Sequence, residues 1–297
     1  MLLPLVSIVI PCYNHEEFVQ DSIQSVINQT YENIELIIID DGSKDSSVEK
    51  IQKMISTCTK RFTRFEFRSR PNKGLSATLN EALEWCEGTY YSALASDDIF
   101  LKNKIQSQID CFLKLNNEKI VGIFGGYNLI DINNKVIKTI LSKNKIYNFN
   151  DIFLHNFNLP APTALLKLEN VKKVGGYDEK LKIEDWFMWL KLTEDGNKLM
   201  SFEQILVNYR SHESNTSKNL EFMNIERKKV IDCFNDNENY SSAKIKLEWL
   251  NTTDSLYINK KNSFLKLKKL LRNKPLKLFS IDMIRFIFHY FKSIFIK

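Results

Sequence analysis

The spacing of apolar residues changes once within the first thirty positions, from a continuous run to a helical repeat. A mostly apolar run, with Ser7 as its single polar residue, covers residues 6–10, and apolar residues between 18 and 27 then recur at helical spacing. This predicts a strand followed by a helix. Asn14 and Glu17 stand where an N-cap and its capping-box partner would begin that helix.

The alternation of the two periods continues along the chain. Further strands are predicted at residues 34–39, 65–67 and 90–94, and helices at the apolar repeats within 48–55, 75–86 and 105–113. Beyond these, a strand pair flanks the Asn133-Asn134 turn, an apolar segment covers 159–166, and a helix begins near Glu184. Because strands that alternate with helices pair in parallel through right-handed crossovers, we expect an α/β fold with an open, mostly parallel sheet flanked by helices.

The regularity of the pattern suggests three parts. Residues 1–100 have the strictest alternation and form one expected half, residues 101–215 form a less regular half that would shape a substrate site, and residues 216–297 form a helical, lysine-rich extension. Ligands of such sheets sit at the carboxyl ends of the strands.

Composition narrows the protein class. The chain has 297 residues, of which 43% are hydrophobic, enough to bury a core. Its five cysteines are odd in number and never form a C-x-x-C pair, which argues against a disulfide framework and a zinc cluster. No basic leader and no stretch of about 18 apolar residues is visible, so we expect a cytoplasmic protein.

Charge is distributed unevenly. The net charge is +6, yet residues 260–297 hold eleven Lys or Arg against the single acid Asp282. This basic, aromatic tail is typical of a segment that lies in the headgroup layer of an anionic membrane. It favours a peripheral position at the inner face of the cytoplasmic membrane. A terminal helix that packs on the body, or in a homodimer, explains the same residues equally well. A basic run outside any known nucleic-acid-binding motif is poor support for nucleic-acid binding.

Paired carboxylates follow two predicted strands. Asp40-Asp41 and Asp97-Asp98 would meet at one edge of the sheet, where a divalent cation can compensate their mutual repulsion. Each pair alone is also a good turn or cap sequence. Two pairs at strand ends favour a metal site of Mg²⁺ or Mn²⁺ beside a nucleotide diphosphate.

These segments, taken in order, resemble the signature of family 2 glycosyltransferases with the GT-A fold. The resemblance covers about 210 residues and rests on Val6-Ser7-Ile8-Val9-Ile10-Pro11-Cys12-Tyr13-Asn14, Ser25-Val26-Ile27-Asn28-Gln29-Thr30-Tyr31, Ile39-Asp40-Asp41-Gly42-Ser43-Lys44-Asp45, Ser96-Asp97-Asp98 and Glu184-Asp185-Trp186. Each segment is weak by itself, and their order makes the resemblance specific.

The resemblance implies a donor-nucleotide site. Its expected members are Pro11, Tyr13, Asn14, Glu16, Asp41 and Asp97. Tyr13 would stack on the base and Asp41 would accept a ring N–H, a combination that suits uracil. Asn72 and Lys73, on the turn after the third strand, would also reach the nucleotide, although that turn serves equally as a connector.

The resemblance also implies the metal and diphosphate contacts. Asp98 would ligate Mn²⁺ or Mg²⁺ directly, His212 would approach the metal, and Arg210 would contact the diphosphate. Ser96 stands where the family's D-x-D motif has its first Asp, which reduces the ligand count. A lone histidine is often simply a surface or core residue.

The expected catalytic base is Asp185. In the resemblance it deprotonates the acceptor hydroxyl, while Glu184 and Trp186 contact the acceptor, and the reaction inverts the anomeric centre in one displacement. An Asp at a helix start also stabilises the helix dipole, and a Trp at helical spacing is often core.

Together these features favour a metal-dependent hexosyl- or N-acetylhexosaminyl-transferase. We expect it to move a sugar from a nucleotide-diphosphate donor, most simply a UDP-sugar, to a glycan or polyprenyl-linked acceptor in bacterial surface polysaccharide synthesis. Two alternatives remain open: a nucleotidyltransferase, for which residues 11–16 lack a glycine-rich phosphate loop, and a non-catalytic nucleotide-sugar-binding or membrane scaffold subunit.

Overall fold

Two compact units make up the chain. The computed structural model describes residues 3–213, 215–273 and 280–295. Unit 1 comprises Met1–Ile152 and Phe157–His212, and unit 2 comprises Phe153–Asn156 and Glu213–Lys297. The expected half 1–100 falls in unit 1, and so does 101–215 apart from residues 153–156 and 213–215, which belong to unit 2. The division at residue 100 stays a prediction. Lys274 and Lys277 of the predicted basic tail lie outside the described residues.

The first half of unit 1 alternates strands and helices as the apolar pattern predicts. Its elements are β1 (Val6–Cys12), α1 (Val19–Ile27), β2 (Ile34–Asp40), α2 (Ser47–Gln52), α3 (Ile55–Arg61), β3 (Arg64–Ser69), α4 (Leu75–Trp85) and β4 (Tyr90–Ala93). All seven residues of β2 are buried, because both faces of this parallel strand are covered.

Two local expectations in this half are wrong. The helix expected around residues 48–55 is two short helices, α2 and α3, with Lys53 and Met54 between them. Asn14 does not cap α1, which begins five residues later and has no side-chain cap. The Asn14 side chain instead accepts a hydrogen bond from the Lys44 main-chain N–H at 2.8 Å, which ties it to the next loop.

The second half of unit 1 is less regular. It contains β5 (Ile99–Phe100), α5 (Lys104–Leu115), β6 (Ile120–Ile130), β7 (Val136–Ile140), β8 (Lys145–Tyr147), α6 (Phe149–Phe153), the 3₁₀ turn η1 (Ala161–Thr163), β9 (Leu165–Lys167), α7 (Leu168–Lys173), α8 (Glu184–Glu194) and β10 (Lys198–Arg210). The expected strand pair around the Asn133-Asn134 turn is confirmed as the antiparallel pair β6 and β7.

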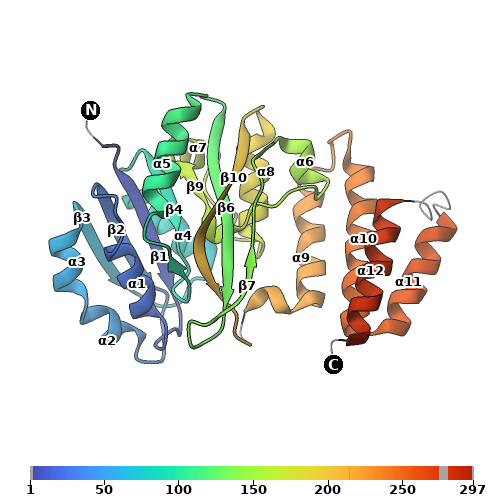
Figure 1. The fold of residues 1–297 in the computed structure, drawn as a ribbon, viewed down its shortest axis with the longest axis horizontal. Coiled ribbons are helices and arrows are strands. Elements are labelled where there is room, and N and C mark those ends of the chain that lie inside the picture. The colour runs from blue at the N-terminus through green and yellow to red at the C-terminus, as the bar shows by residue number, and fades with distance from the viewer. Residues whose placement is uncertain (1–2, 214, 274–279, 296–297) are drawn as a thin grey trace. The chain divides into compact units, whose positions relative to one another are not determined.

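One sheet joins both halves of unit 1. Its strand order is β3-β2-β1-β4-β9-β6-β10-β5, with β7 beside β6 and β8 beside β10 (Figure 1). The first four strands are parallel, whereas β9 runs antiparallel to both of its neighbours. Cys12 is in register with Asp40, and Asp40 with Ser69, so β1, β2 and β3 end together. The loops that follow them therefore gather at one edge of the sheet.

Unit 2 is helical. It contains η2 (Thr216–Lys218), α9 (Leu220–Asp232), α10 (Tyr240–Ile258), α11 (Lys260–Asn273) and α12 (Ile281–Phe295), coloured orange to red in Figure 1. Its core cluster consists of Trp249, Leu256, Leu267, Leu270 and Phe286, from the last three helices. Among the described residues, every helix is too short or too polar to cross a membrane.

Candidate active site

The loops after β1 and β2 hold each other in place. Besides the contact of Asn14, the Glu16 carboxylate accepts a hydrogen bond from the Ser46 N–H at 2.9 Å. Two residues expected at the donor nucleotide thus also shape the loop on which Tyr13 lies. Tyr13 itself is 45% exposed, which leaves much of its ring accessible to a base.

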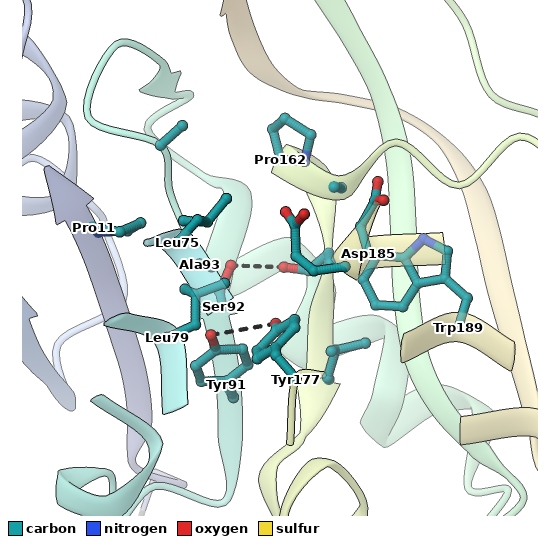
Figure 2. A pocket seen from close by; sticks show the side chains of 15 residues that line it. Pro11, Leu75, Leu79, Tyr91, Ser92, Ala93, Pro162, Tyr177, Asp185 and Trp189 are labelled. Carbon is teal, nitrogen blue, oxygen red and sulfur yellow. Dashed lines mark hydrogen bonds between the residues drawn. The ribbon is translucent and has the colours of Figure 1, made fainter. Parts of the chain in front are cut away.

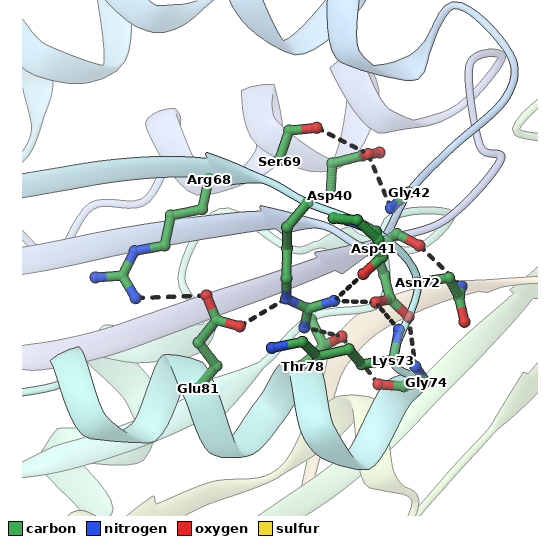
Figure 3. Close-up of polar contacts among 12 residues, drawn as sticks. Asp40, Asp41, Gly42, Arg68, Ser69, Asn72, Lys73, Gly74, Thr78 and Glu81 are labelled. Atoms are coloured by element: carbon green, nitrogen blue, oxygen red, sulfur yellow. Dashed lines mark hydrogen bonds and ion pairs between the residues drawn. The ribbon is translucent and has the colours of Figure 1, made fainter.

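Asp41 is a nearly buried acceptor at the end of β2. Its carboxylate accepts hydrogen bonds from the main-chain N–H groups of Lys73 and Gly74 at 2.8 and 2.9 Å, and pairs with Arg70 (Figure 3). Asn72 donates from its side chain to the Asp41 carbonyl at 2.8 Å. The structure therefore brings Asp41, Asn72 and Lys73 together, as expected. A carboxylate has about four lone-pair sites, so one acceptor position beyond these three contacts remains for a ligand.

Arg70 anchors this arrangement to α4. Its guanidinium also donates to Glu81 at 2.6 Å and to the Thr78 hydroxyl at 3.0 Å. Burial alone would lower the pKa of Arg70, but the hydrogen bonds to Glu81 and Asp41 raise it above its usual value. The charge is therefore permanent, and it fixes the position of the Asp41 carboxylate.

A glycine is required in the turn after Asp41. Gly42 has a φ of +79°, and a Cβ there would lie 2.7 Å from the main-chain nitrogen of Asn72. The Asp40 carboxylate accepts from the N–H groups of Gly42 and Ser43 at 3.2 and 3.0 Å. Asp40 thus stabilises the turn, which agrees with the interpretation of Asp40-Asp41 as a turn sequence.

Two histidines and one carboxylate meet at the ends of β1, β4 and β10. His212 Nε2 lies 2.7 Å from Asp97 Oδ2, and His15 Nδ1 lies 4.0 Å from Asp97 Oδ1. One ligand atom from each of the three residues falls within 4.8 Å of the other two. Phe18 stacks on the His212 ring with centroids 5.5 Å apart, which orients the imidazole.

Asp98 faces the interior instead. It is fully buried, and its Oδ1 accepts a hydrogen bond from the Arg210 main-chain N–H at 2.8 Å. Burial raises the pKa of Asp98 well above its ordinary value, and the neighbouring Asp97 charge adds to this. The metal set expected from the sequence, Asp98 with His212, is therefore not the set that the structure brings together. Asp97 is the carboxylate that lies beside His212, and which of the two would ligate a cation stays a prediction.

Arg210 is also buried. Its guanidinium donates to the main-chain carbonyl of Asp97 at 2.7 Å and to that of Asp131 at 3.3 Å, and lies 4.6 Å above the Phe18 ring. These contacts fasten the loop that carries Asp97 to the end of β10. These contacts give Arg210 a positioning role. They do not support the predicted direct contact between Arg210 and a diphosphate, which stays a prediction.

The residues at this edge fit a divalent cation. Two imidazole nitrogens and one carboxylate converge from three separate elements, and these are donors that first-row transition metals accept. Imidazole is a poorer ligand for Mg²⁺, which prefers oxygen donors. Of the two ions expected from the sequence, the donor set suits Mn²⁺ better.

A cavity of about 110 Å³ lies in unit 1 (Figure 2). Its walls are mainly apolar and come from Pro11, Leu75, Leu79, Tyr91, Ser92, Ala93, Ala95, Ala161, Pro162, Ala164, Leu166, Tyr177, Glu184, Asp185 and Trp189. The Tyr177 hydroxyl donates to that of Tyr91 at 3.4 Å. The lining thus combines Ala95, which lies on the loop after β4 that also carries Asp97, with the two carboxylates of α8.

Those two carboxylates share a low-polarity environment. Burial raises the pKa of Asp185, while the Trp186 N–H, which donates to Asp185 Oδ1 at 2.7 Å, works in the opposite direction. Burial and the charge of Asp185 together raise the pKa of Glu184 to about 8. Burial therefore works against both carboxyls carrying a charge at the same time.

The two tryptophans of α8 differ in position. Trp186 is 3% exposed, and its indole N–H donates to the Ile152 carbonyl at 3.2 Å. Trp189, not Trp186, lines the cavity. We therefore no longer propose Trp186 as an acceptor contact, because its polar atom and its ring are both engaged in the core.

Sequence reasoning missed three parts of this site. His15 and Arg70 lie in the same strand-end loops as the residues that were singled out, so their position was the available signal. Tyr177 lies on the Gly175–Glu179 turn, and nothing in the local sequence indicates that its hydroxyl reaches Tyr91. That contact joins positions 86 residues apart.

The order and geometry of these segments match a known family. Residues 7–175 match the profile described as Glycosyl transferase family 2. The chain belongs to this family. An uncharacterized glycosyltransferase of Rickettsia bellii is 31% identical over 230 residues, which are 75% of this chain and 32% of that protein. The chain thus spans about a third of the length of this family 2 relative, and at most two thirds of the other rickettsial relatives.

One family 2 relative whose name states a reaction aligns with this chain over most of the relative's length. The Escherichia coli protein WfgD, named a UDP-Glc:alpha-D-GlcNAc-diphosphoundecaprenol beta-1,3-glucosyltransferase, is 32% identical over 217 residues, covering 72% of this chain and 80% of WfgD.

Solved structures confirm the predicted GT-A fold. TarS of S. aureus, in complex with UDP-GlcNAc, superposes with a TM-score of 0.64 at 15% identity and covers 88% of this chain and 75% of that one. The mannosyltransferase PcManGT of Pyrobaculum calidifontis, in complex with GDP-Man and Mn²⁺, also has a TM-score of 0.64, at 12% identity, covering 100% of this chain and 89% of that one.

Proposed function

We propose that this protein is an inverting glycosyltransferase that moves a sugar from a UDP-sugar to a hydroxyl of a glycan or polyprenyl-linked acceptor. One observation carries the proposal: Asp185 lines a cavity whose wall also includes Ala95, on the loop after β4 that carries Asp97. A base for the acceptor hydroxyl and a cation for the leaving diphosphate are the parts that a single displacement needs.

In the proposed reaction, the Asp185 carboxylate takes the proton of the acceptor hydroxyl. The acceptor oxygen forms its bond to the anomeric carbon, and the bond from that carbon to the diphosphate oxygen breaks on the other face. The electron pair leaves with the nucleoside diphosphate, so the configuration inverts. Protonated Glu184 donates a hydrogen bond to the acceptor and holds it beside Asp185.

On the donor side of the proposed reaction, His15, Asp97 and His212 would hold the cation. A divalent ion there would neutralise charge on the leaving diphosphate. The Phe18 stack and the Arg210 contacts keep His212 and Asp97 in position for it. The assignment of Asp97 replaces the earlier expectation for Asp98.

The proposed base site is formed by Tyr13 and Asp41. Asp41 is fixed by Arg70 and two main-chain N–H groups, and its remaining acceptor site suits the ring N–H of uracil. Guanine would instead present donors and acceptors along a larger edge. The UDP-Glc donor in the name of WfgD supports the same choice.

The proposed acceptor follows from the relatives. WfgD is named for a diphosphoundecaprenol-linked acceptor, and the E. coli protein WbnJ, 29% identical over 224 residues, is named an O-antigen biosynthesis glycosyltransferase. We therefore place this protein in bacterial surface polysaccharide synthesis, at the cytoplasmic side of the membrane where nucleotide sugars are found.

Calorimetric titration tests the proposal. The purified protein is titrated with UDP, GDP and dTDP, each with Mn²⁺, with Mg²⁺ and with EDTA. We expect UDP to bind most tightly and only with a cation, with Mn²⁺ above Mg²⁺. UDP release is then measured with UDP-Glc and UDP-GlcNAc in the presence of a polyprenyl-diphosphate-linked sugar. Failure of all three nucleotides to bind would favour the scaffold alternative.

A further inference from the structure

Helix α12 has two opposed apolar faces. One face packs inward: Phe286 is 2% exposed in the core of unit 2, and Met283 and Tyr290 pack against the same cluster. The other face is exposed to solvent, with Ile281, Ile284, Phe288 and Phe291 between 57% and 69% exposed. Ile287 and Ile294 are exposed beside them, at 43% and 46%.

The exposed residues form one stripe. Successive positions 281, 284, 288 and 291 are three or four residues apart, which places them on the same side of a helix. Single exposed apolar side chains are ordinary on a protein surface, but six on one helix form a contiguous patch of the kind that marks a binding surface. Core packing of α12 already uses the other face, so core formation does not account for this stripe.

Cations border the stripe. Arg285 and Lys292 are exposed on α12 itself. The neighbouring helix α11 exposes further cations, among them Lys261, Lys268 and Arg272. The single acid of this region, Asp282, accepts a hydrogen bond from Lys246 at 2.5 Å and lies 3.7 Å from Arg285. Its charge is therefore compensated, and the surface around the stripe is basic.

We propose that α12 lies in the headgroup layer of an anionic lipid bilayer, with Ile284 and Phe288 entering the acyl boundary and the cations of α11 and α12 contacting lipid phosphates. Apolar side chains bind the acyl boundary of a bilayer, and Lys and Arg bind its anionic headgroups, so an apolar stripe bordered by cations fits this surface. A second copy of the chain is a poorer occupant, because a symmetric contact through this face would bring like charges together.

This partner goes beyond the proposed function and does not depend on it. If both hold, the enzyme would work at the surface where a lipid-linked acceptor is presented. Membrane attachment by one amphipathic helix is reversible, so the attached fraction would depend on the anionic lipid content and on salt.

Vesicle sedimentation tests the proposal. The full chain is mixed with vesicles of phosphatidylcholine alone, and with vesicles that contain about one third phosphatidylglycerol. We expect the protein to sediment with the anionic vesicles, and salt to weaken this binding. The double variant Ile284→Asp/Phe288→Asp should lower the partition coefficient about tenfold or more. The variant Lys268→Glu/Arg272→Glu should lower it while leaving the stripe intact.

Matched controls separate the interpretations. Leu113→Asp replaces an equally exposed apolar residue, 59% exposed on α5, and should leave vesicle binding unchanged. Circular dichroism and the melting temperature show whether each variant is folded. Equal binding to neutral vesicles, or retention by the folded double variant, would overturn the proposal. A third result would also overturn it: light scattering shows that the wild-type protein is a dimer and the double variant a monomer, while the wild-type protein does not bind vesicles. No nucleotide sugar is present, so these results are independent of transfer activity.

Discussion

His212 Nε2 lies 2.7 Å from Asp97 Oδ2, across 115 residues of sequence. The contact closes the end of β10 onto the end of β4 and leaves the adjacent Asp98 facing the interior. It determines which of the two neighbouring carboxylates lies beside the histidines, where we propose the cation site.

Substitution of the two carboxylates should separate their roles. We expect Asp97→Asn to weaken Mn²⁺-dependent UDP binding about 100-fold or more, because it removes the charged ligand of the cluster. Asp98→Asn should change it little, because an amide oxygen can still accept from the Arg210 N–H. Calorimetry with UDP and Mn²⁺ measures both. A loss confined to Asp98→Asn would restore the original sequence-based assignment.

Asp185→Asn tests the catalytic base. Loss of proton abstraction should lower kcat about a thousandfold, while the dissociation constant for UDP stays within error. UDP release assays and calorimetry give the two quantities. If nucleotide binding is lost together with transfer, Asp185 is a structural residue at the start of α8 rather than a base.

The pH profile of kcat/KM should be bell-shaped. Transfer requires ionised Asp185, whose pKa is raised by burial, so activity should rise with pH along an acid limb above the ordinary Asp range. It requires protonated Glu184, whose pKa is about 8, so activity should fall as pH increases through that value. Glu184→Gln keeps a neutral donor and should abolish the alkaline limb only. Persistence of that limb in the variant would assign it to another group.

Arg70→Met should destabilise the fold. The substitution leaves Asp41 and Glu81 without their shared cation, and breaking such a mostly buried network costs about 3 kcal/mol. Arg68→Met is the matched control, because Arg68 is 34% exposed and pairs with Glu66 and Glu81 near the surface; we expect less than about 1 kcal/mol there. Urea denaturation at neutral pH measures both, and equal losses would contradict the role of Arg70.

Local patterns predicted the α/β framework correctly because burial imposes a period on each element. The strands β1, β2 and β4 and the helices α4, α5 and α8 are visible as apolar periods. Parallel pairing then follows from the alternation itself, and it places Asp41 and Asp97 at one sheet edge. The expected grouping of Asp41 with Asn72 and Lys73 needed no more information than that.

Side-chain direction was beyond the sequence. Asp97 and Asp98 are identical in type and adjacent. Only packing of the β10 end turns Asp97 toward the His212 ring and Asp98 toward the main-chain N–H of Arg210. The same holds for Trp186 and Trp189 on α8: both are 3% exposed, yet Trp186 donates to the Ile152 carbonyl, whereas Trp189 lines the cavity.

The sequence by itself determined the elements of this protein, their order and the edge at which its chemistry gathers, because those follow from periods within short segments. Tertiary structure alone decided which side chains meet, as with His15 and Asp97, because such contacts join loops that are far apart in the chain and depend on how every intervening element packs.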